Sequence, residues 1–243
     1  MPSVLIALVV LACASVGASA RADSLHQGTF WTGYMSSWWI DRSWALWFDT
    51  HYNVESFVVL RGGVTRAFEA GPSVTAGYAY LRINPDLDRQ EHRPWAQAVI
   101  PLRLNDDWRF SQRIRTDFRF QQSLDQGEIV DGFDFTFRAR FQSTFTRRLP
   151  KLRSGQPFVQ ISDEVLLNLG STTLPVGLDQ NRVSLLFGIE LELLTIRSGY
   201  MNRYSPGSGG TSGVYEHGFI LWFTQSVDLG RGETEQVPEA GGS

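Results

Sequence analysis

The stretch WRFSQRIRTDFRFQQ, residues 108–122, decides the fold because its side chains alternate in character along the chain. One parity holds mainly large apolar residues, namely Trp108, Phe110, Ile114, Phe118 and Phe120. The other holds mainly polar and charged residues, namely Arg109, Ser111, Arg113, Arg115, Asp117, Arg119 and Gln121. Successive side chains of a β-strand point to opposite faces, so this pattern predicts a strand with one apolar and one charged face. The alternation alone does not decide which face looks inward.

The N-terminal residues indicate export from the cytoplasm. Residues 3–16, SVLIALVVLACASV, form a short apolar run that small residues follow, although no Lys or Arg precedes it. This pattern predicts a signal peptide over residues 1–22, cleaved after Ala20 or Ala22. Cys13, the only cysteine, lies within this segment, so the mature chain would have no disulfide. A second interpretation, in which Cys13 is lipidated, stays open.

Composition excludes some classes of protein. The net charge of −3 on 243 residues gives no reason to expect a nucleic-acid partner. Beyond residue 22, no run of 18 consecutive apolar residues predicts a transmembrane helix. A closed β-barrel is the other structure that can cross a bilayer with its backbone polar groups satisfied. We expect one barrel domain over residues 23–230, followed by a polar tail over residues 231–243.

Strand-like segments recur along the whole domain. They lie near residues 28–39, 43–53, 57–67, 73–83, 91–103, 108–121, 131–146, 157–168, 180–190, 193–203 and 214–227. Most have about ten residues or more, the length that a tilted membrane-spanning strand needs. The fold class that we predict is all-β, a single antiparallel transmembrane β-barrel of 10–12 strands. Because single-chain bacterial barrels have an even number of strands, we expect 10 or 12, with both termini in the periplasm.

Connections and aromatic residues favour a membrane barrel. Short turns, such as Asn105–Asp107, alternate with longer connections, such as Ser123–Val130. Outer-membrane barrels have short periplasmic turns and longer external loops. Tryptophans stand beside short turns and tyrosines near the opposite ends, as aromatic girdles require: Trp38, Trp39, Trp44 and Trp108, against Tyr52, Tyr80, Tyr204 and Tyr215. We therefore expect the apolar face to contact lipid, and localisation in the cell outer membrane.

The charged parity must then face the lumen. An arginine on the lipid face near the bilayer midplane costs about 2–4 kcal/mol, and several per strand would prevent folding. We predict a polar ladder in the lumen formed by Arg93, Arg109, Arg113, Arg115, Asp117, Arg119, Arg138, Arg140, Glu164, Arg182 and Arg197, together with Asp49, Glu91, Asp134 and Glu190. Paired guanidinium and carboxylate groups would fill the interior. Two roles stay open, a structural plug and a narrow pore or site for a small anionic solute.

No catalytic or metal site is predicted. Of the histidines His26, His51, His92 and His217, only His26 lies in a Ser-x-His pair, with Ser24, and partners on other strands stay open. The sequence has no His-Glu-x-x-His motif, no Cys pair and no Gly-rich phosphate loop, so we expect no cofactor. An enzyme is therefore less favoured than a non-catalytic barrel.

Several motifs resemble those of a family of Gram-negative outer-membrane barrels, domain of unknown function 2490. They are DQNRVSLLFGIELELLTIRSGYMNRY (179–204), EHRPW (91–95), QISDEVLLN (160–168) and the early FWTGYMSSWWIDRSWALWF. The resemblance implies an outer-membrane barrel and supplies no catalytic residues. In addition, EHGFILWF, residues 216–223, resembles the terminal-strand signature that the outer-membrane assembly machinery reads, although about twenty residues follow it.

We therefore predict an outer-membrane barrel, structural or forming a narrow pore, whose partners are outer-membrane lipids, the outer-membrane assembly machinery and a small anionic solute. Two alternatives stay open. One is an outer-membrane enzyme that modifies lipid or lipopolysaccharide, and the other is a soluble periplasmic β-barrel that binds an apolar ligand.

Overall fold

A computed structural model describes residues 25–53, 56–83, 88–207 and 212–229 of the chain. The predicted signal peptide, Cys13 and the polar tail over residues 231–243 lie outside the described residues. None of the described residues belongs to a helix long and apolar enough to span a membrane.

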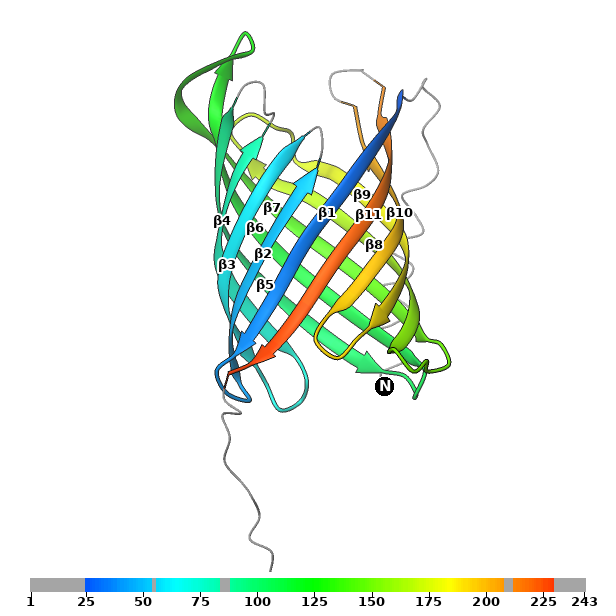
Figure 1. Cartoon of the computed structure of the whole chain (residues 1–243). Helices are drawn as coiled ribbons and strands as arrows, with labels where there is room; N and C mark the ends of the chain where they lie inside the picture. The colour runs from blue at the N-terminus through cyan, green and yellow to red at the C-terminus, as the bar shows by residue number, and fades with distance from the viewer. Residues whose placement is uncertain (1–24, 54–55, 84–87, 208–211, 230–243) are drawn as a thin grey trace, which may run out of the picture.

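Eleven strands form one closed barrel, which confirms the all-β prediction (Figure 1). Each strand pairs with its neighbours in the chain, and β1 also pairs with β11. The strands are β1 (Leu25–Trp39), β2 (Trp44–Asn53), β3 (Phe57–Ala67), β4 (Ser73–Ile83), β5 (Arg89–Arg103), β6 (Trp108–Asp125), β7 (Glu128–Arg148), β8 (Gln156–Ser171), β9 (Gly177–Glu190), β10 (Thr195–Ser205) and β11 (Val214–Asp228). Every segment expected from the sequence is one of these strands.

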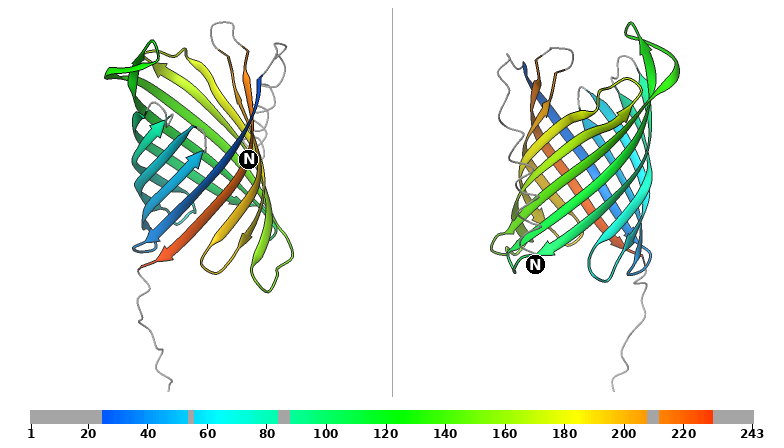
Figure 2. Two further views of the ribbon diagram at one scale, coloured as in Figure 1. Left: turned by 45° about the horizontal axis from the view of Figure 1, so that its top comes forward. Right: turned by 180° about the vertical axis from the view of Figure 1, so that it is seen from behind.

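The closing pair corrects two expectations. β1 and β11 run parallel, in register from Leu25 opposite Val214 to Trp39 opposite Asp228. An odd number of strands brings the last strand into the barrel in the same direction as the first. The expectation of 10 or 12 strands, all antiparallel, is therefore wrong. β1 begins and β11 ends at opposite ends of the barrel (Figure 2), so the barrel does not begin and end on one side as expected.

The connection between β6 and β7 is also shorter than expected. The two strands continue to the pair Asp125–Glu128 and project beyond the rest of the barrel (Figure 1). Gln126 and Gly127, the two turn residues, have φ angles of 49° and 89°. Positive φ at both positions is typical of a type I′ turn, whose twist matches that of the strands it joins. Residues 123–130 are therefore mostly hairpin and not a long loop.

The short turns at the end of the barrel opposite the β6–β7 hairpin include two in which an Asp or Asn side chain caps the backbone. Asp41 Oδ1 accepts hydrogen bonds from the backbone N–H groups of Ser43, at 2.6 Å, and Trp44, at 2.8 Å. Asn105 Oδ1 accepts the equivalent bonds from Asp107, at 3.0 Å, and Trp108, at 2.8 Å. Side chains of Asp and Asn that bind the backbone two residues on favour tight turns. The same backbone N–H groups lower the pKa of the Asp41 carboxyl.

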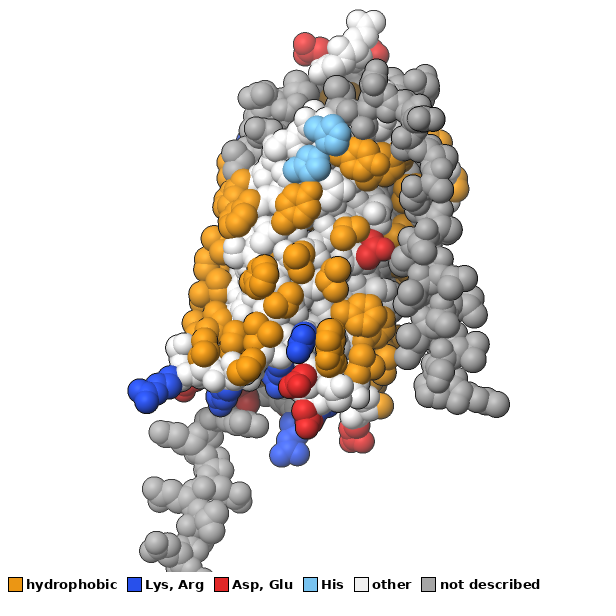
Figure 3. All heavy atoms as spheres, turned by 90° about the vertical axis from the view of Figure 1, so that its right-hand side faces the viewer, with side chains coloured by type: hydrophobic (Ala, Val, Ile, Leu, Met, Phe, Trp, Pro, Cys, Tyr) orange, Lys and Arg blue, Asp and Glu red, His pale blue; other side chains and the backbone are white. Residues whose placement is uncertain are grey.

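The strand register sets which face looks inward. On β2, Leu46 and Phe48 are 47% and 46% exposed, whereas Ala45 and Asp49, which flank them, are 0% and 1% exposed. In the region quoted first, Phe118 is exposed on the outer wall and Asp117 is buried inside. Phe110 points outward but is buried, and the Phe145 ring lies beside it at 4.7 Å between centroids. Apolar side chains cover much of the outer wall between the two rims (Figure 3).

Candidate functional site

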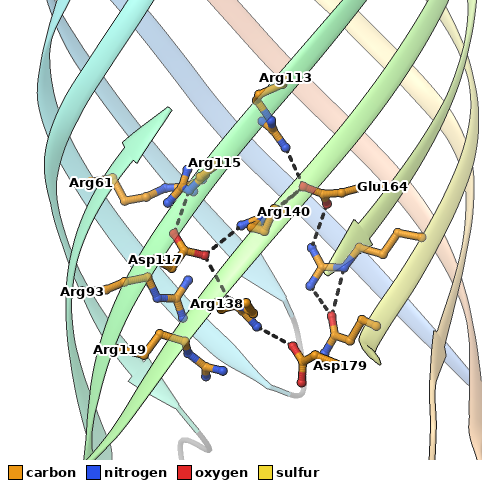
Figure 4. A network of polar contacts seen from close by, with 12 residues as sticks. Arg61, Arg93, Arg113, Arg115, Asp117, Arg119, Arg138, Arg140, Glu164 and Asp179 are labelled. Atoms are coloured by element: carbon orange, nitrogen blue, oxygen red, sulfur yellow. Dashed lines mark hydrogen bonds and ion pairs between the residues drawn. The ribbon is translucent and has the colours of Figure 1, made fainter. Parts of the chain in front are cut away.

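Two buried carboxylates, Asp117 and Glu164, each pair with several arginines inside the lumen. Asp117, on β6, is 0% exposed and lies 2.8 Å from Arg115 Nε, 3.4 Å from Arg138 Nη2 and 3.6 Å from Arg140 Nη1 (Figure 4). One carboxylate thus faces three guanidinium groups from β6 and the adjacent β7. Since residues two apart on a strand share a face, and β6 and β7 pair in register, the sequence alternation itself brings these groups together.

Glu164, on β8, is the second of these carboxylates. It accepts bonds of 2.7 Å from both Arg113 and Arg140, and Arg182 lies 3.6 Å away. Arg140 therefore joins Glu164 to Asp117. Arg138 continues the chain of contacts to Asp179, at 2.8 Å. We call these residues the waist network: Arg113, Arg115, Asp117, Arg138, Arg140, Glu164, Asp179 and Arg182.

A separate cluster surrounds Glu91 on β5. Glu91 is 0% exposed and accepts a bond of 2.6 Å from Arg93. Arg119 donates to both oxygens of the carboxylate, at 2.9 and 3.0 Å, and Gln121 donates at 2.8 Å. The two-point contact uses the planar fork of arginine, which a lysine could not reproduce.

Two predicted members of the ladder lie outside both groups. Arg109 is 44% exposed and comes no closer than 3.9 Å to Glu190. Arg197 Nη2 donates to the Thr224 hydroxyl at 2.6 Å, and no carboxylate in the described part of the chain lies within ion-pair distance of it. Two predicted carboxylates, Asp134 and Glu190, are only partly buried, near the two rims.

Sequence reasoning missed four charged residues of the lumen. Arg61 donates to Asp49 at 2.6 Å, Arg203 pairs with Glu216, and Asp179 belongs to the waist network. Arg203 lies directly opposite Glu216 in the register of β10 and β11, so pairing these two strands could have found both. Asp179 was expected in a connection, but β9 begins at Gly177 and brings its side chain inside.

Aromatic rings extend the arginine-rich region. The Arg115 guanidinium lies 4.4 Å from the Trp95 ring, and those of Arg182 and Arg203 each lie 5.4 Å from the Trp31 ring. Contacts of this kind stabilise a desolvated cation by about 1–2 kcal/mol. They also place one side of these guanidinium groups against an apolar surface.

A cavity of about 540 Å³ lies inside the barrel. Its wall from β6 to β9 is mainly polar and includes Arg113, Arg140, Gln142 and Glu164. The wall from β1, β3, β4, β10 and β11, with part of β9, is mainly apolar and includes Trp31, Val59, Leu81, Leu186, Met201 and Ile220. An eight-stranded barrel has an interior just filled by side chains, so the additional strands account for this space.

Histidines form no catalytic constellation in the described residues. His51 lies inside the barrel, 3.5 Å from Asp49. His26 and His217 lie on the outside and contact each other at 2.8 Å, and His217 also contacts Tyr200 at 2.6 Å. His92 contacts Tyr78. No serine is bonded to any of them among these contacts, and the described residues hold no group of three or more metal-ligating side chains.

Comparison with known proteins gives one match. The model of the family described as "Protein of unknown function (DUF2490)" matches residues 28–213. No curated protein and no solved structure matches the chain. Residues 28–213 include ten of the strands in whole or in large part, from β1 to β10, and all of the waist network. The chain therefore belongs to the DUF2490 family, as an eleven-stranded mixed β-barrel with a buried, arginine-rich network of salt bridges.

Proposed function

We propose that the chain is an integral barrel of the bacterial outer membrane, whose lumen is closed at the waist network and binds an anionic solute. The excess of arginine over carboxylate in the lumen carries the second part of this proposal. The arginines are Arg61, Arg93, Arg113, Arg115, Arg119, Arg138, Arg140, Arg182, Arg197 and Arg203, and the carboxylates are Asp49, Glu91, Asp117, Glu164, Asp179 and Glu216. A buried cation without a partner is costly, so such a lumen favours an anion.

The outer wall supports the membrane location. Large apolar side chains on many strands are about 40–60% exposed, among them Leu60, Phe141, Leu185, Phe187 and Phe219. A monomeric soluble protein rarely exposes a continuous apolar patch beyond a few hundred Å². The expected girdle residues Trp38, Trp44, Trp108 and Tyr52 are also exposed. A membrane would cover all of these surfaces.

Several polar contacts interrupt the outer wall, among them a hydrogen bond of 2.8 Å from Ser143 to Gln112 and one accepted by Asp163. Asp163 shares the outward parity of β8 with the exposed Ile161, and it accepts a hydrogen bond of 2.7 Å from Asn181 on β9. A hydrogen-bonded carboxylate on a lipid face costs less than an arginine at the same depth. Polar groups whose hydrogen bonds are satisfied in this way are compatible with insertion in a bilayer.

The waist network supports a closed lumen. Asp117 and Arg115 are at most 2% exposed, so water hardly reaches them. Salt bridges from four neighbouring strands, β6 to β9, meet in this region (Figure 4). Ions would have to pass beside these side chains and not through a wide water-filled channel.

The experiment uses the folded chain in liposomes and planar bilayers. We expect the protein to stay in the vesicles after an alkaline carbonate wash and to give little or no conductance. We also expect acetate and inorganic phosphate to bind to it in calorimetric titrations. Release by the wash would contradict the membrane location, and a large stable conductance would contradict closure. Failure of both anions to bind would contradict the proposed ligand.

A further inference from the structure

Arg197 is the lumen cation with the least compensation. Among the described residues, its side chain donates a hydrogen bond to the Thr224 hydroxyl, and the positive charge of Arg113 acts on it unfavourably. Arg113 itself shares Glu164 with Arg140 and Arg182. Both Arg113 and Arg197 line the cavity. An anion between them would supply the missing negative charge.

Unsatisfied hydrogen-bonding groups of the cavity wall point to the same ligand chemistry. Among the described residues that line the cavity, the buried side-chain atoms without a hydrogen-bond partner are all N–H donors: Trp31 Nε1 and the Nε atoms of Arg113, Arg138, Arg197 and Arg203. Hydroxyl and amide groups of Ser111, Thr144 and Gln160 lie on the same wall. A ligand that offers acceptors and no donors, such as a carboxylate, matches this wall.

An apolar surface adjoins the Arg197 site. In the register of β9, β10 and β11, Trp222 lies opposite Arg197, while Leu186 and Ile220 lie on either side of Gly199, two residues along. Met201 follows on the same face, and these residues pack with Trp31 in one buried cluster. Lumens of transmembrane barrels are usually polar. The lumen of this barrel has an aliphatic strip of Leu186, Met201 and Ile220, which begins beside Arg197.

We propose that the cavity binds an unbranched aliphatic monocarboxylate, a fatty-acid-like molecule, with its head between Arg197 and Arg113 and its chain along Leu186, Met201 and Ile220. The inference rests on the anion-binding function proposed above and names the class of its ligand. A volume of about 540 Å³ suits a ligand of this size, since pockets for small molecules span about 300–1,000 Å³.

The test is calorimetric titration of the folded full chain in neutral maltoside micelles with sodium acetate, sodium decanoate, inorganic phosphate and decyltrimethylammonium bromide. We expect decanoate to bind at least about tenfold more tightly than acetate, because each buried methylene adds up to about fourfold. The cation should not bind above the level seen in protein-free micelles.

Three variants locate the ligand. Arg197→Gln should weaken the binding of decanoate and acetate about tenfold, the value of one charge-assisted hydrogen bond. Arg147→Gln removes the same charge from the rim, where the Arg147 guanidinium lies over the Trp108 ring, and should change neither affinity. Met201→Gln places a polar group of similar size on the aliphatic strip. It should lower the affinity for decanoate and leave that for acetate unchanged.

Each other outcome overturns the inference in an identifiable way. Equal affinity for acetate and decanoate would leave a site for small anions, so the proposed function would stand and the aliphatic ligand would fall. Decyltrimethylammonium binding as tightly as decanoate would show partition into apolar surface alone. If no anion bound, both proposals would fail. If Arg197→Gln did not fold, the decanoate-to-acetate ratio of the Met201→Gln variant would still decide.

Discussion

At the scale of single residues, the stability of the lumen depends on carboxylates that each form ion pairs with several arginines. Asp117 is fully buried and contacts Arg115, Arg138 and Arg140. Burying charges costs several kcal/mol per ion, and the mutual attraction repays this cost only while every charge keeps its partners. Loss of a shared carboxylate should therefore matter more than loss of any one ion pair on the surface.

We predict that Asp117→Asn lowers the free energy of unfolding by about 3–5 kcal/mol, because three buried guanidinium groups lose their common counter-charge. Asp106→Asn is the matched control, since Asp106 is 93% exposed and pairs with a mostly exposed Arg103 at 2.6 Å. Its effect should stay within about 0.5 kcal/mol. Urea unfolding in micelles, followed by tryptophan fluorescence, measures both. Equal effects would show that the waist network is not a structural unit.

The alternation of β6 and β7 was enough to predict which side chains of these strands meet inside, because parity fixes the face of every residue on a strand. It could not predict which carboxylate serves which arginine. That depends on the register with β8 and β9, and on where β9 begins. Asp179 was missed for this reason, and Arg197 was expected in a ladder although no carboxylate of the described chain reaches it.

At the scale of elements, the hairpin between β6 and β7 carries a residue poorly suited to its turn. Gln126 has a φ of 49°, which lies in the left-handed region. This backbone conformation costs most residues other than glycine about 1–2 kcal/mol. Asn tolerates this conformation better and is favoured in type I′ turns. The segment DQGE has no Asn-Gly or Asp-Gly dipeptide, which is why the sequence suggested a longer loop.

We predict that Gln126→Asn stabilises the hairpin by about 0.5–1 kcal/mol, as part of the left-handed penalty is removed. Hydrogen exchange of the backbone amides near the end of β6 and the start of β7 would measure this as slower local opening. Asp125→Asn introduces the same residue at a position without positive φ, so it should leave exchange unchanged. Faster exchange in Gln126→Asn would argue against the type I′ turn.

At the scale of the whole molecule, the barrel has eleven strands, whereas an even number was expected. The eleven segments could be counted in the sequence, but the even-number rule led to an expectation of 10 or 12. Nothing in the pattern of a strand shows which distant strand it pairs with at closure. The parallel seam between β1 and β11 is therefore the feature of the fold least accessible to sequence reasoning.

Cross-linking tests the seam. Phe30 and Phe219 are paired across it, with outward rings stacked at 5.9 Å between centroids. In a chain with Cys13 replaced by alanine, the double variant Phe30→Cys and Phe219→Cys should form an intramolecular disulfide under mild oxidation. Phe30→Cys with Phe223→Cys, four residues away on β11, should not. A disulfide in the second variant and none in the first would exclude the parallel register.

In the proposed orientation, the apolar wall faces lipid and the arginines face the interior. The most direct test attaches a nitroxide spin label at Phe118, on the outer wall, and at Gln142, in the lumen, in chains folded into liposomes. Relaxation is then measured with oxygen and with a water-soluble nickel chelate. The label at position 118 should collide with oxygen and be shielded from nickel, and that at 142 should meet little oxygen. Free access of nickel to position 118, equal to that at exposed Leu152, would contradict the account.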